Sequence, residues 1–179
     1  MTIRPARASD VSAMQAIEVA AGELFRTVGM DDIADAEPFD AAELAEYVED
    51  GRAWVAVDEG DEAIGYAVVD VVDGRGHLEQ LSVVPAAQGR GHGRALVEAV
   101  VGWAVERGFD AVTLTTFRDV EWNRPLYERL GFAVLAQDEW GPELRALVAE
   151  EAEMGLDPAL RVCMRRPATS SSRSRRPPG

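Results

Sequence analysis

The residues best suited to chemistry in this chain form a glycine-rich turn, Gln88-Gly89-Arg90-Gly91-His92-Gly93. It lies between a β-branched segment ending near Val84 and an apolar helical segment beginning near Arg94. The first backbone N–H groups of a helix have no intrahelical partner, and the helix dipole favours an anion beside them. Glycines let such a backbone approach a phosphate closely. The turn therefore predicts a pyrophosphate cradle, with added positive charge from Arg90 and Arg94, although an ordinary tight turn is the alternative.

Two better-known phosphate loops do not fit this turn. A nucleotide-triphosphate P-loop needs Gly-Lys-Ser/Thr at the start of the helix, and the chain contains no lysine. The dinucleotide fingerprint needs a third small residue at a fixed spacing, where counting from Gly89 or Gly91 gives Arg94 or Leu96. Both alternatives are therefore excluded.

A second segment makes the interpretation more specific. Gln88-x-x-Gly91-x-Gly93, directly after a strand, resembles the acetyl-CoA signature of the GNAT superfamily of N-acetyltransferases. Downstream, Trp122-Asn123-Arg124-Pro125-Leu126-Tyr127-Glu128-Arg129-Leu130-Gly131-Phe132 resembles that family's Asn…Tyr…Gly-Phe segment. In element order the resemblance covers roughly residues 2–165. The stretches Leu114–Arg118 and Leu156–Met164 also look like a bacterial group of the family whose acceptor is unassigned.

The resemblance implies a V-shaped opening between the strands at 77–84 and 111–116, in which acetyl-CoA binds. The residues implied to contact it are Leu81, Ser82, Val83, Gln88, Gly89, Arg90, Gly91, His92, Gly93, Arg94 and Asn123. The pantetheine arm would pair with the first three residues like an added strand, and the diphosphate would lie on the glycine turn. Tyr127 would point at the sulfur atom.

The implied reaction, acetyl transfer to an amine, needs a base because a protonated amine has no lone pair. An alkyl amine has a pKa of about 10.4. Side chains alternate along a strand, so His77 and Glu79 are expected on the same face as Leu81 and Val83, beside the acetyl group. We favour Glu79 as the base because a carboxylate also attracts a cationic acceptor, and His77 is the second candidate. A solvated Glu79 and a purely structural His77 are the alternatives.

The departing thiolate needs a proton donor, and Tyr127 carries an O–H group. Its helical spacing to Leu126 and Leu130 also permits a place in the core. A backbone N–H near Leu81 would meet the oxyanion. Direct transfer needs no covalent enzyme intermediate, and Cys163 is expected to be packed in the core. No metal site is expected, because the chain has no Cys/His cluster.

The segment 22–39 shows no clean period and is expected to be a loop with at most a helical turn. In folds of this family such a loop supplies acceptor contacts, here Phe25 and Met30 as apolar contacts and Glu23 and Asp31 as attracting charges. Its acids predict a small-molecule amine or a basic peptide as acceptor, although a run of charge is usually a solvated face.

The elements that must position these residues follow from hydrophobic periodicity. Strands are expected at 2–7, 53–57, 63–72, 77–84, 111–116, 132–136 and 160–164, and helices at 11–21, 40–48, 94–107, 120–130 and 142–153. This order predicts one α/β domain over residues 1–166, with a mixed, mostly antiparallel sheet and helices on both faces, the acyl-CoA N-acyltransferase fold. Residues 167–179 are expected to form a disordered basic Pro/Ser/Arg tail.

The composition of the chain limits the kinds of partner that it is expected to bind. A net charge of −14 argues against nonspecific nucleic-acid binding, which depends on neutralising phosphates. No apolar run approaches the roughly 20 residues that span a bilayer, and no signal peptide is evident. The single cysteine fits a reducing compartment. We therefore expect a cytoplasmic protein without membrane or nucleic-acid partners, and a homodimer stays open.

Two other functions stay open at this point. The chain could be a noncatalytic acyl-CoA-binding sensor, against which Tyr127 and the carboxylate of Glu79 argue. It could also be an acyltransferase that uses a longer acyl group or transfers to a hydroxyl. The length of the acyl group that can be accepted depends on the volume of the pocket beyond the thioester, which a sequence does not give.

Overall fold

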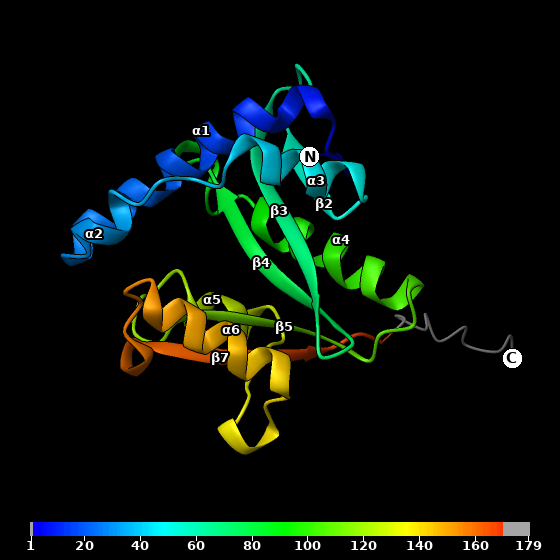
Figure 1. Ribbon diagram of the computed structural model, residues 1–179. Helices are drawn as coiled ribbons and strands as arrows, with labels where there is room; N and C mark the ends of the chain where they lie inside the picture. Colours follow the sequence, from blue (N-terminus) through cyan, green and yellow to red (C-terminus); the bar gives the residue numbers. More distant parts are fainter. Residues whose placement is uncertain (1, 170–179) are drawn as a thin grey trace, which may run out of the picture.

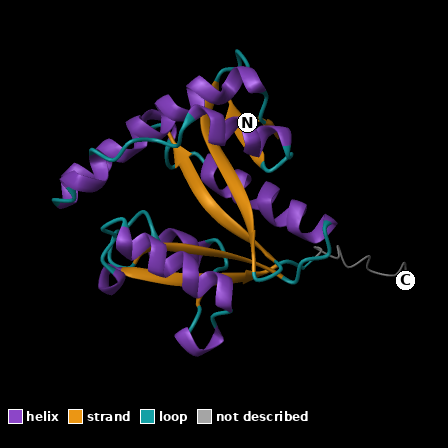
Figure 2. Ribbon diagram, viewed as in Figure 1, coloured by secondary structure: helices purple, strands orange, loops and turns teal. Residues whose placement is uncertain are grey.

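Seven strands form one sheet in the order β1-β2-β3-β4-β5-β7-β6, and helices cover both of its faces (Figures 1 and 2). The computed structural model describes residues 2–169. The strands are β1 Thr2–Pro5, β2 Ala53–Val57, β3 Ala63–Val72, β4 Arg75–Val83, β5 Ala111–Phe117, β6 Ala133–Val134 and β7 Arg161–Pro167. All neighbours are antiparallel except β4 and β5. The predicted mixed, mostly antiparallel sheet with helices on both faces is confirmed.

The helices divide between the two faces. They are α1 Val11–Gly22, α2 Asp31–Ala34, α3 Ala41–Glu49, α4 His92–Glu106, α5 Arg124–Arg129 and α6 Pro142–Glu153, with short 3₁₀ turns η1 Ala8–Asp10, η2 Glu23–Val28, η3 Pro85–Ala87, η4 Gln137–Glu139 and η5 Pro158–Leu160. Helices α1, α3 and α6 pack on one face, and α4 and α5 on the other (Figure 1). We call these the α6 face and the α4 face.

Strands β4 and β5 separate soon after they begin to run side by side. They pair in parallel only at Gly76↔Val112 and His77↔Thr113. Beyond these pairs, β4 continues in the half of the sheet with β1–β3, and β5 continues with β7 and β6 (Figure 1). The V-shaped opening that the sequence resemblance implied is therefore present in the fold.

A β-bulge at Glu79 changes which residues of β4 share a face. Val68 pairs with Gln80 while the next residue, Val69, pairs with Leu78, so Glu79 is an extra residue without a partner on β3. Leu78 and Leu81 therefore both pack into the core of the α4 face. The prediction that His77 and Glu79 share a face with Leu81 and Val83 was wrong, because simple alternation does not hold across a bulge.

Several other segments differ from the predicted elements, among them α5, which spans Arg124–Arg129 rather than 120–130, and β6, which spans Ala133–Val134 rather than 132–136. The expected loop 22–39 is largely helical, since η2 and α2 follow α1 with short breaks. Strand β4 begins at Arg75 rather than His77, because Asp73 and Gly74 both adopt positive φ and make a two-residue hairpin turn. Strand β7 extends to Pro167, and the N–H of Ala168 still donates to Asp110, at 2.9 Å. The remainder of the predicted tail, residues 170–179, lies outside the described residues.

Within residues 2–169, no helix combines the length and apolar character needed to cross a membrane. In the same range, no three histidine, cysteine, aspartate or glutamate side chains are grouped so as to hold a metal ion.

The close approach of β3 and β4 beside the opening gives a stability prediction. A Cβ atom at Gly65 would lie 3.0 Å from the Ser82 carbonyl oxygen and 3.0 Å from a methyl of Val83. We expect Gly65→Ala to lower the free energy of unfolding by about 1–3 kcal/mol, as overpacking typically does, measured by urea denaturation.

Gly102, on the exposed side of α4, is the matched control because a Cβ atom there has no neighbour within 4 Å. Gly102→Ala should raise the free energy of unfolding by about 0.5–1 kcal/mol through helix propensity. Equal effects of the two substitutions would contradict the tight packing of β3 on β4.

Candidate active site

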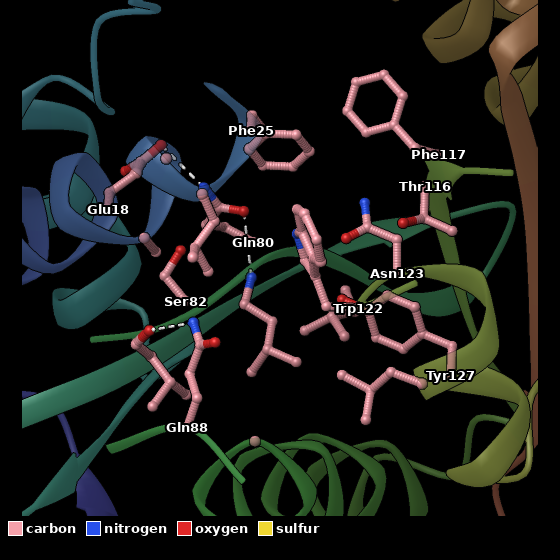
Figure 3. Close-up of a pocket in the computed structure, with 18 of the residues that line it drawn as sticks. Glu18, Phe25, Gln80, Ser82, Gln88, Thr116, Phe117, Trp122, Asn123 and Tyr127 are labelled. Atoms are coloured by element: carbon pink, nitrogen blue, oxygen red, sulfur yellow. Dashed lines mark hydrogen bonds between the residues drawn. The ribbon is translucent and has the colours of Figure 1, made fainter. Parts of the chain in front are cut away.

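The opening between β4 and β5 holds a pocket of about 710 Å³, bounded by elements from both faces of the sheet (Figure 3). The predicted site residues that line it are Phe25, Glu79, Leu81, Ser82, Val83, Gln88, Gly89, Gly91, His92, Gly93, Arg94, Asn123 and Tyr127. The predicted site residues that do not line it are Glu23, Met30, Asp31, His77 and Arg90. One cavity thus gathers most of the predicted site.

Helix α4 presents its N-terminus to this pocket. The first of its N–H groups with a partner is that of Ala95, which donates to the Gly91 carbonyl at 3.0 Å, and the N–H groups of residues 89–94 form no hydrogen bond within the described part of the chain. Gly91 has φ 88°, a left-handed conformation that favours glycine. A Cβ atom at Gly93 would touch only Leu81, at 4.0 Å, so glycine there leaves room in the pocket. These features fit a bound diphosphate.

Two glutamine side chains cover the free edge of β4. The N–H of Val84 bonds to β3, so the backbone groups of Leu81 and Val83 are directed to the opening. There the N–H of Leu81 donates to Gln80 Oε1 at 3.2 Å, and the carbonyl of Val83 accepts from Gln88 Nε2 at 3.0 Å (Figure 3). These are the backbone positions that the amides of an added extended chain would use.

Asn123 and Tyr127 face the pocket from α5 and its N-terminus (Figure 3). The Tyr127 N–H donates to the Asn123 carbonyl at 3.0 Å, which fixes the two residues on one turn. The ring of Tyr127 packs edge-on against Phe132, with centroids 5.7 Å apart. Its hydroxyl makes no hydrogen bond to any described residue, and burial raises the pKa of Tyr127. The phenol is therefore protonated at neutral pH and able to donate.

Glu79 lines the pocket, and its carboxyl group has a raised pKa. Its side chain is 30% exposed. Burial raises the pKa of Glu79 to about 7, and the nearby carboxylates of Asp70 and Glu151 act in the same direction. A carboxylate with this pKa can take up a proton near neutral pH.

His77 lies behind Glu79 rather than on the pocket wall. Its side chain is 1% exposed, and its Nδ1 shares a hydrogen bond with the Thr113 hydroxyl at 2.9 Å. Burial lowers the pKa of His77 to about 4, so the ring is neutral at physiological pH. Its Nε2 lies 3.8 Å from Glu79 Oε2, beyond hydrogen-bond distance. This geometry favours a structural position for His77.

Most acids of the 22–39 segment lie away from the pocket, and three of them pair with Arg26. Arg26 pairs with Glu23 at 3.0 Å, with Asp31 at 3.6 Å and with Asp35 at 2.5 Å. Phe25 instead turns inward, and its ring lies 5.5 Å from that of Phe117 and 5.9 Å from that of Trp122 (Figure 3). The segment therefore contributes Phe25 as an aromatic wall, and Glu37 is the one of its acids that lines the pocket.

Sequence reasoning missed several residues that line the pocket. The polar ones are Glu18, Gln80, Thr115, Thr116 and Arg161, and the aromatic ones are Phe117 and Trp122. Trp122 begins the Asn…Tyr segment, and Arg161 lies in the stretch Leu156–Met164, so both had a sequence signal. Glu18 had none, because it is one polar residue on an amphipathic helix.

Comparison with known proteins agrees with this geometry. The family profile described as "Acetyltransferase (GNAT) family" matches residues 17–132. The structure of Rv2747 from Mycobacterium tuberculosis, in complex with CoA and NLQ, is similar, with a TM-score of 0.69 and 21% identity over 93% of this chain and 99% of that one. The ribosomal-protein-S18-alanine N-acetyltransferase of Escherichia coli gives a TM-score of 0.63 and 20% identity, over 97% of each chain.

A further similar structure is the PaiA N-acetyltransferase of Thermoplasma acidophilum in complex with coenzyme A. Its TM-score is 0.68 at 15% identity, over 93% of this chain and 98% of that one. At these identities the structures support the fold, and the profile match, which spans more than half of the chain, supports the family. With the pocket and the glycine turn at the start of α4, this leads to one conclusion: the chain belongs to the GNAT family of acetyltransferases.

Proposed function

We propose that this protein transfers the acetyl group of acetyl-CoA directly to a primary amine, with both substrates bound at once. The observation that carries the proposal is the pocket itself. The pocket brings three features together. The N–H groups at the start of α4 and the Tyr127 hydroxyl form no hydrogen bond with the described residues, and Glu79 has a pKa of about 7. A binding module would need the first feature, but the other two are suited to moving protons.

The residues present fit acetyl-CoA on the α4 face. Residues 88–94 would bind the diphosphate through backbone N–H groups, and Arg94, at the pocket wall, adds positive charge. Leu81 and Val83 would bind the pantetheine amides once the Gln80 and Gln88 side chains move aside. Asn123 would contact the same arm. When bound, acetyl-CoA supplies an activated thioester that an amine attacks at its carbonyl carbon.

Glu79 would act as the general base. An alkyl amine is mostly protonated at neutral pH, because its pKa is about 10.4. The Glu79 carboxylate would take a proton from the ammonium group, directly or through a water, so that the neutral amine can attack. A base with a pKa near 7 is well matched to this task at physiological pH.

Tyr127 would act as the general acid. As the C–S bond breaks, the sulfur atom gains negative charge and needs a proton. The Tyr127 hydroxyl is protonated and uncommitted, so it can donate to the thiolate. The N–H of Leu81 would donate to the oxygen atom that becomes negative during attack. The amine nitrogen, positively charged after the attack, would return a proton to the Tyr127 phenolate, and Glu79 would release its proton to solvent. The protons and charges then balance without a covalent enzyme intermediate.

Substitution of Glu79 and of Tyr127 tests their proposed roles. Glu79→Gln and Tyr127→Phe should each lower acceptor-dependent release of CoA thiol by about 10²-fold or more, the usual contribution of a general base or acid. The measurement is thiol release from acetyl-CoA with pooled amines, after subtraction of hydrolysis without acceptor. Affinity for acetyl-CoA should change little in either variant.

Glu49→Gln is the control, because Glu49 ends α3, is exposed and does not line the pocket. It should turn over like the unaltered protein. Acetyl-CoA binding without thiol release for any amine would favour the noncatalytic sensor. Faster release from longer acyl-CoAs than from acetyl-CoA would favour the alternative acyl donor.

The pH dependence of turnover tests the role of Glu79 as the base. Glu79 must be ionised to act as a base, so kcat/KM should fall as the pH drops through about 7. Asp70→Asn should move this inflection to lower pH, because the Asp70 charge contributes to the raised pKa of Glu79. An inflection that does not move in Asp70→Asn, or that persists in Glu79→Gln, would assign the titration to another group.

A further inference from the structure

Two stretches noted in the sequence, Leu114–Arg118 and Leu156–Met164, have no part in the steps above, yet they meet at the pocket. Their strands β5 and β7 pair side by side, with Phe117 opposite Arg161. Val162 and Met164 point into the core of the α4 face. Arg161 therefore points to the α6 face, where it lines the pocket together with Glu79.

Arg161 is held firmly in one orientation. Its Nη2 donates to Glu151 Oε1 at 2.7 Å and to the Thr115 hydroxyl at 2.9 Å. Its guanidinium stacks on the ring of Phe117, 4.8 Å from the centroid. The side chain is only 14% exposed, although it reaches the pocket wall. Partners on α6 and β5 thus preorganise one arginine, which lowers the entropy lost when a ligand binds to it.

The same guanidinium keeps donors that the described residues do not use. Its Nε is buried and has no hydrogen-bond partner within residues 2–169. Nη1 is not fully buried and likewise donates to none of these residues. Since Nη2 is already committed, the unused donors point to an acceptor group that a pocket ligand would bring.

Glu18, a carboxylate that lines the pocket, does not compete for these donors. Both oxygens of Glu18 are occupied, by the Tyr66 hydroxyl at 2.5 Å, by Gln80 Nε2 at 2.8 Å and by the Phe39 N–H at 3.2 Å. The other arginines that line the pocket, Arg94 and Arg129, come from α4 and α5, on the α4 face. Arg161 is therefore the guanidinium that lines the pocket from the α6 face.

We infer that the acetyl acceptor is an α-amino acid, whose carboxylate binds Arg161 while its amine lies at Glu79. A guanidinium matches a carboxylate better than any other ligand group except phosphate. An acceptor with an amine and a carboxylate on neighbouring atoms uses both pocket groups at once. The inference rests on the proposed function, and it names an acceptor with a carboxylate in place of the basic acceptor predicted from the acids of segment 22–39, of which Glu37 alone lines the pocket.

The test compares matched acceptors. Each common L-amino acid is assayed for thiol release from acetyl-CoA beside its α-carboxamide and its decarboxylated amine, with rates corrected for the fraction of neutral amine. For the amino acids that react, kcat/KM should exceed that of both partners by about 10-fold or more, the size typical of a charged hydrogen bond. Equal or faster reaction of the decarboxylated amines would overturn the inference.

Variants assign the preference to Arg161. Arg161→Met should reduce the ratio of amino acid to amine toward one. The double variant Glu151→Gln, Arg161→Met should do the same without leaving the Glu151 charge unpaired. Arg165→Met is the matched control, because Arg165 lies four residues further along β7, also pairs with a glutamate, Glu139, at 3.1 Å, and does not line the pocket. It should keep the full ratio, and loss of the ratio in Arg165→Met alone would contradict the assignment.

A binding measurement separates this inference from the proposed function. Saturation-transfer NMR with the CoA-bound protein detects amino-acid binding without turnover. Binding that needs Arg161, in the absence of thiol release, would uphold the amino-acid site at Arg161 and refute the acetyl transfer. Thiol release with simple amines, in the absence of any amino-acid binding, would refute the inference and uphold the transfer.

Discussion

The site depends on the early separation of β4 and β5. Two parallel residue pairs join them, and beyond these pairs each strand has a free edge. Free strand edges leave backbone N–H and C=O groups that must find other partners. On β4 those partners are the side chains of Gln80 and Gln88, which can be exchanged for a ligand more easily than a neighbouring strand could. The separation therefore creates both the pocket and its capacity to bind an extended arm.

The bulge at Glu79 gives this opening two chemically different faces. Leu81 and Val83 pack with the core of the α4 face, where the glycine turn and Tyr127 also lie. Glu79 is directed to the α6 face, near Asp70, Glu151 and Arg161, whose charges act on its pKa. One strand can thus support a thioester from one side and an amine from the other. Arg161 extends the α6 side to a group that binds the acceptor and takes no part in the chemistry.

The element order, the glycine turn and the Asn123–Tyr127 segment could be predicted because each depends on residues close together in the sequence. Which side chains of β4 share a face could not be predicted, because the bulge depends on how β3 pairs with β4. The position of Arg161 also depends on tertiary structure, since its partner Glu151 lies on a helix that packs across β7. The acids of segment 22–39 could be recognised in the sequence, but which of them face the pocket depends on the helical turns η2 and α2, which were not predicted.

Amide chemical shifts of the isotope-labelled protein, followed during titration with acetyl-CoA, test the central claim most directly. The account predicts saturable shifts at Leu81, Gly91 and Gly93, which line the pocket, and little change at Gly29 and Gly108, which do not. The Gln80 and Gln88 side-chain amides should shift together with them. Saturable shifts confined to residues outside the opening, or none at all, would contradict the assignment of this pocket to acetyl-CoA.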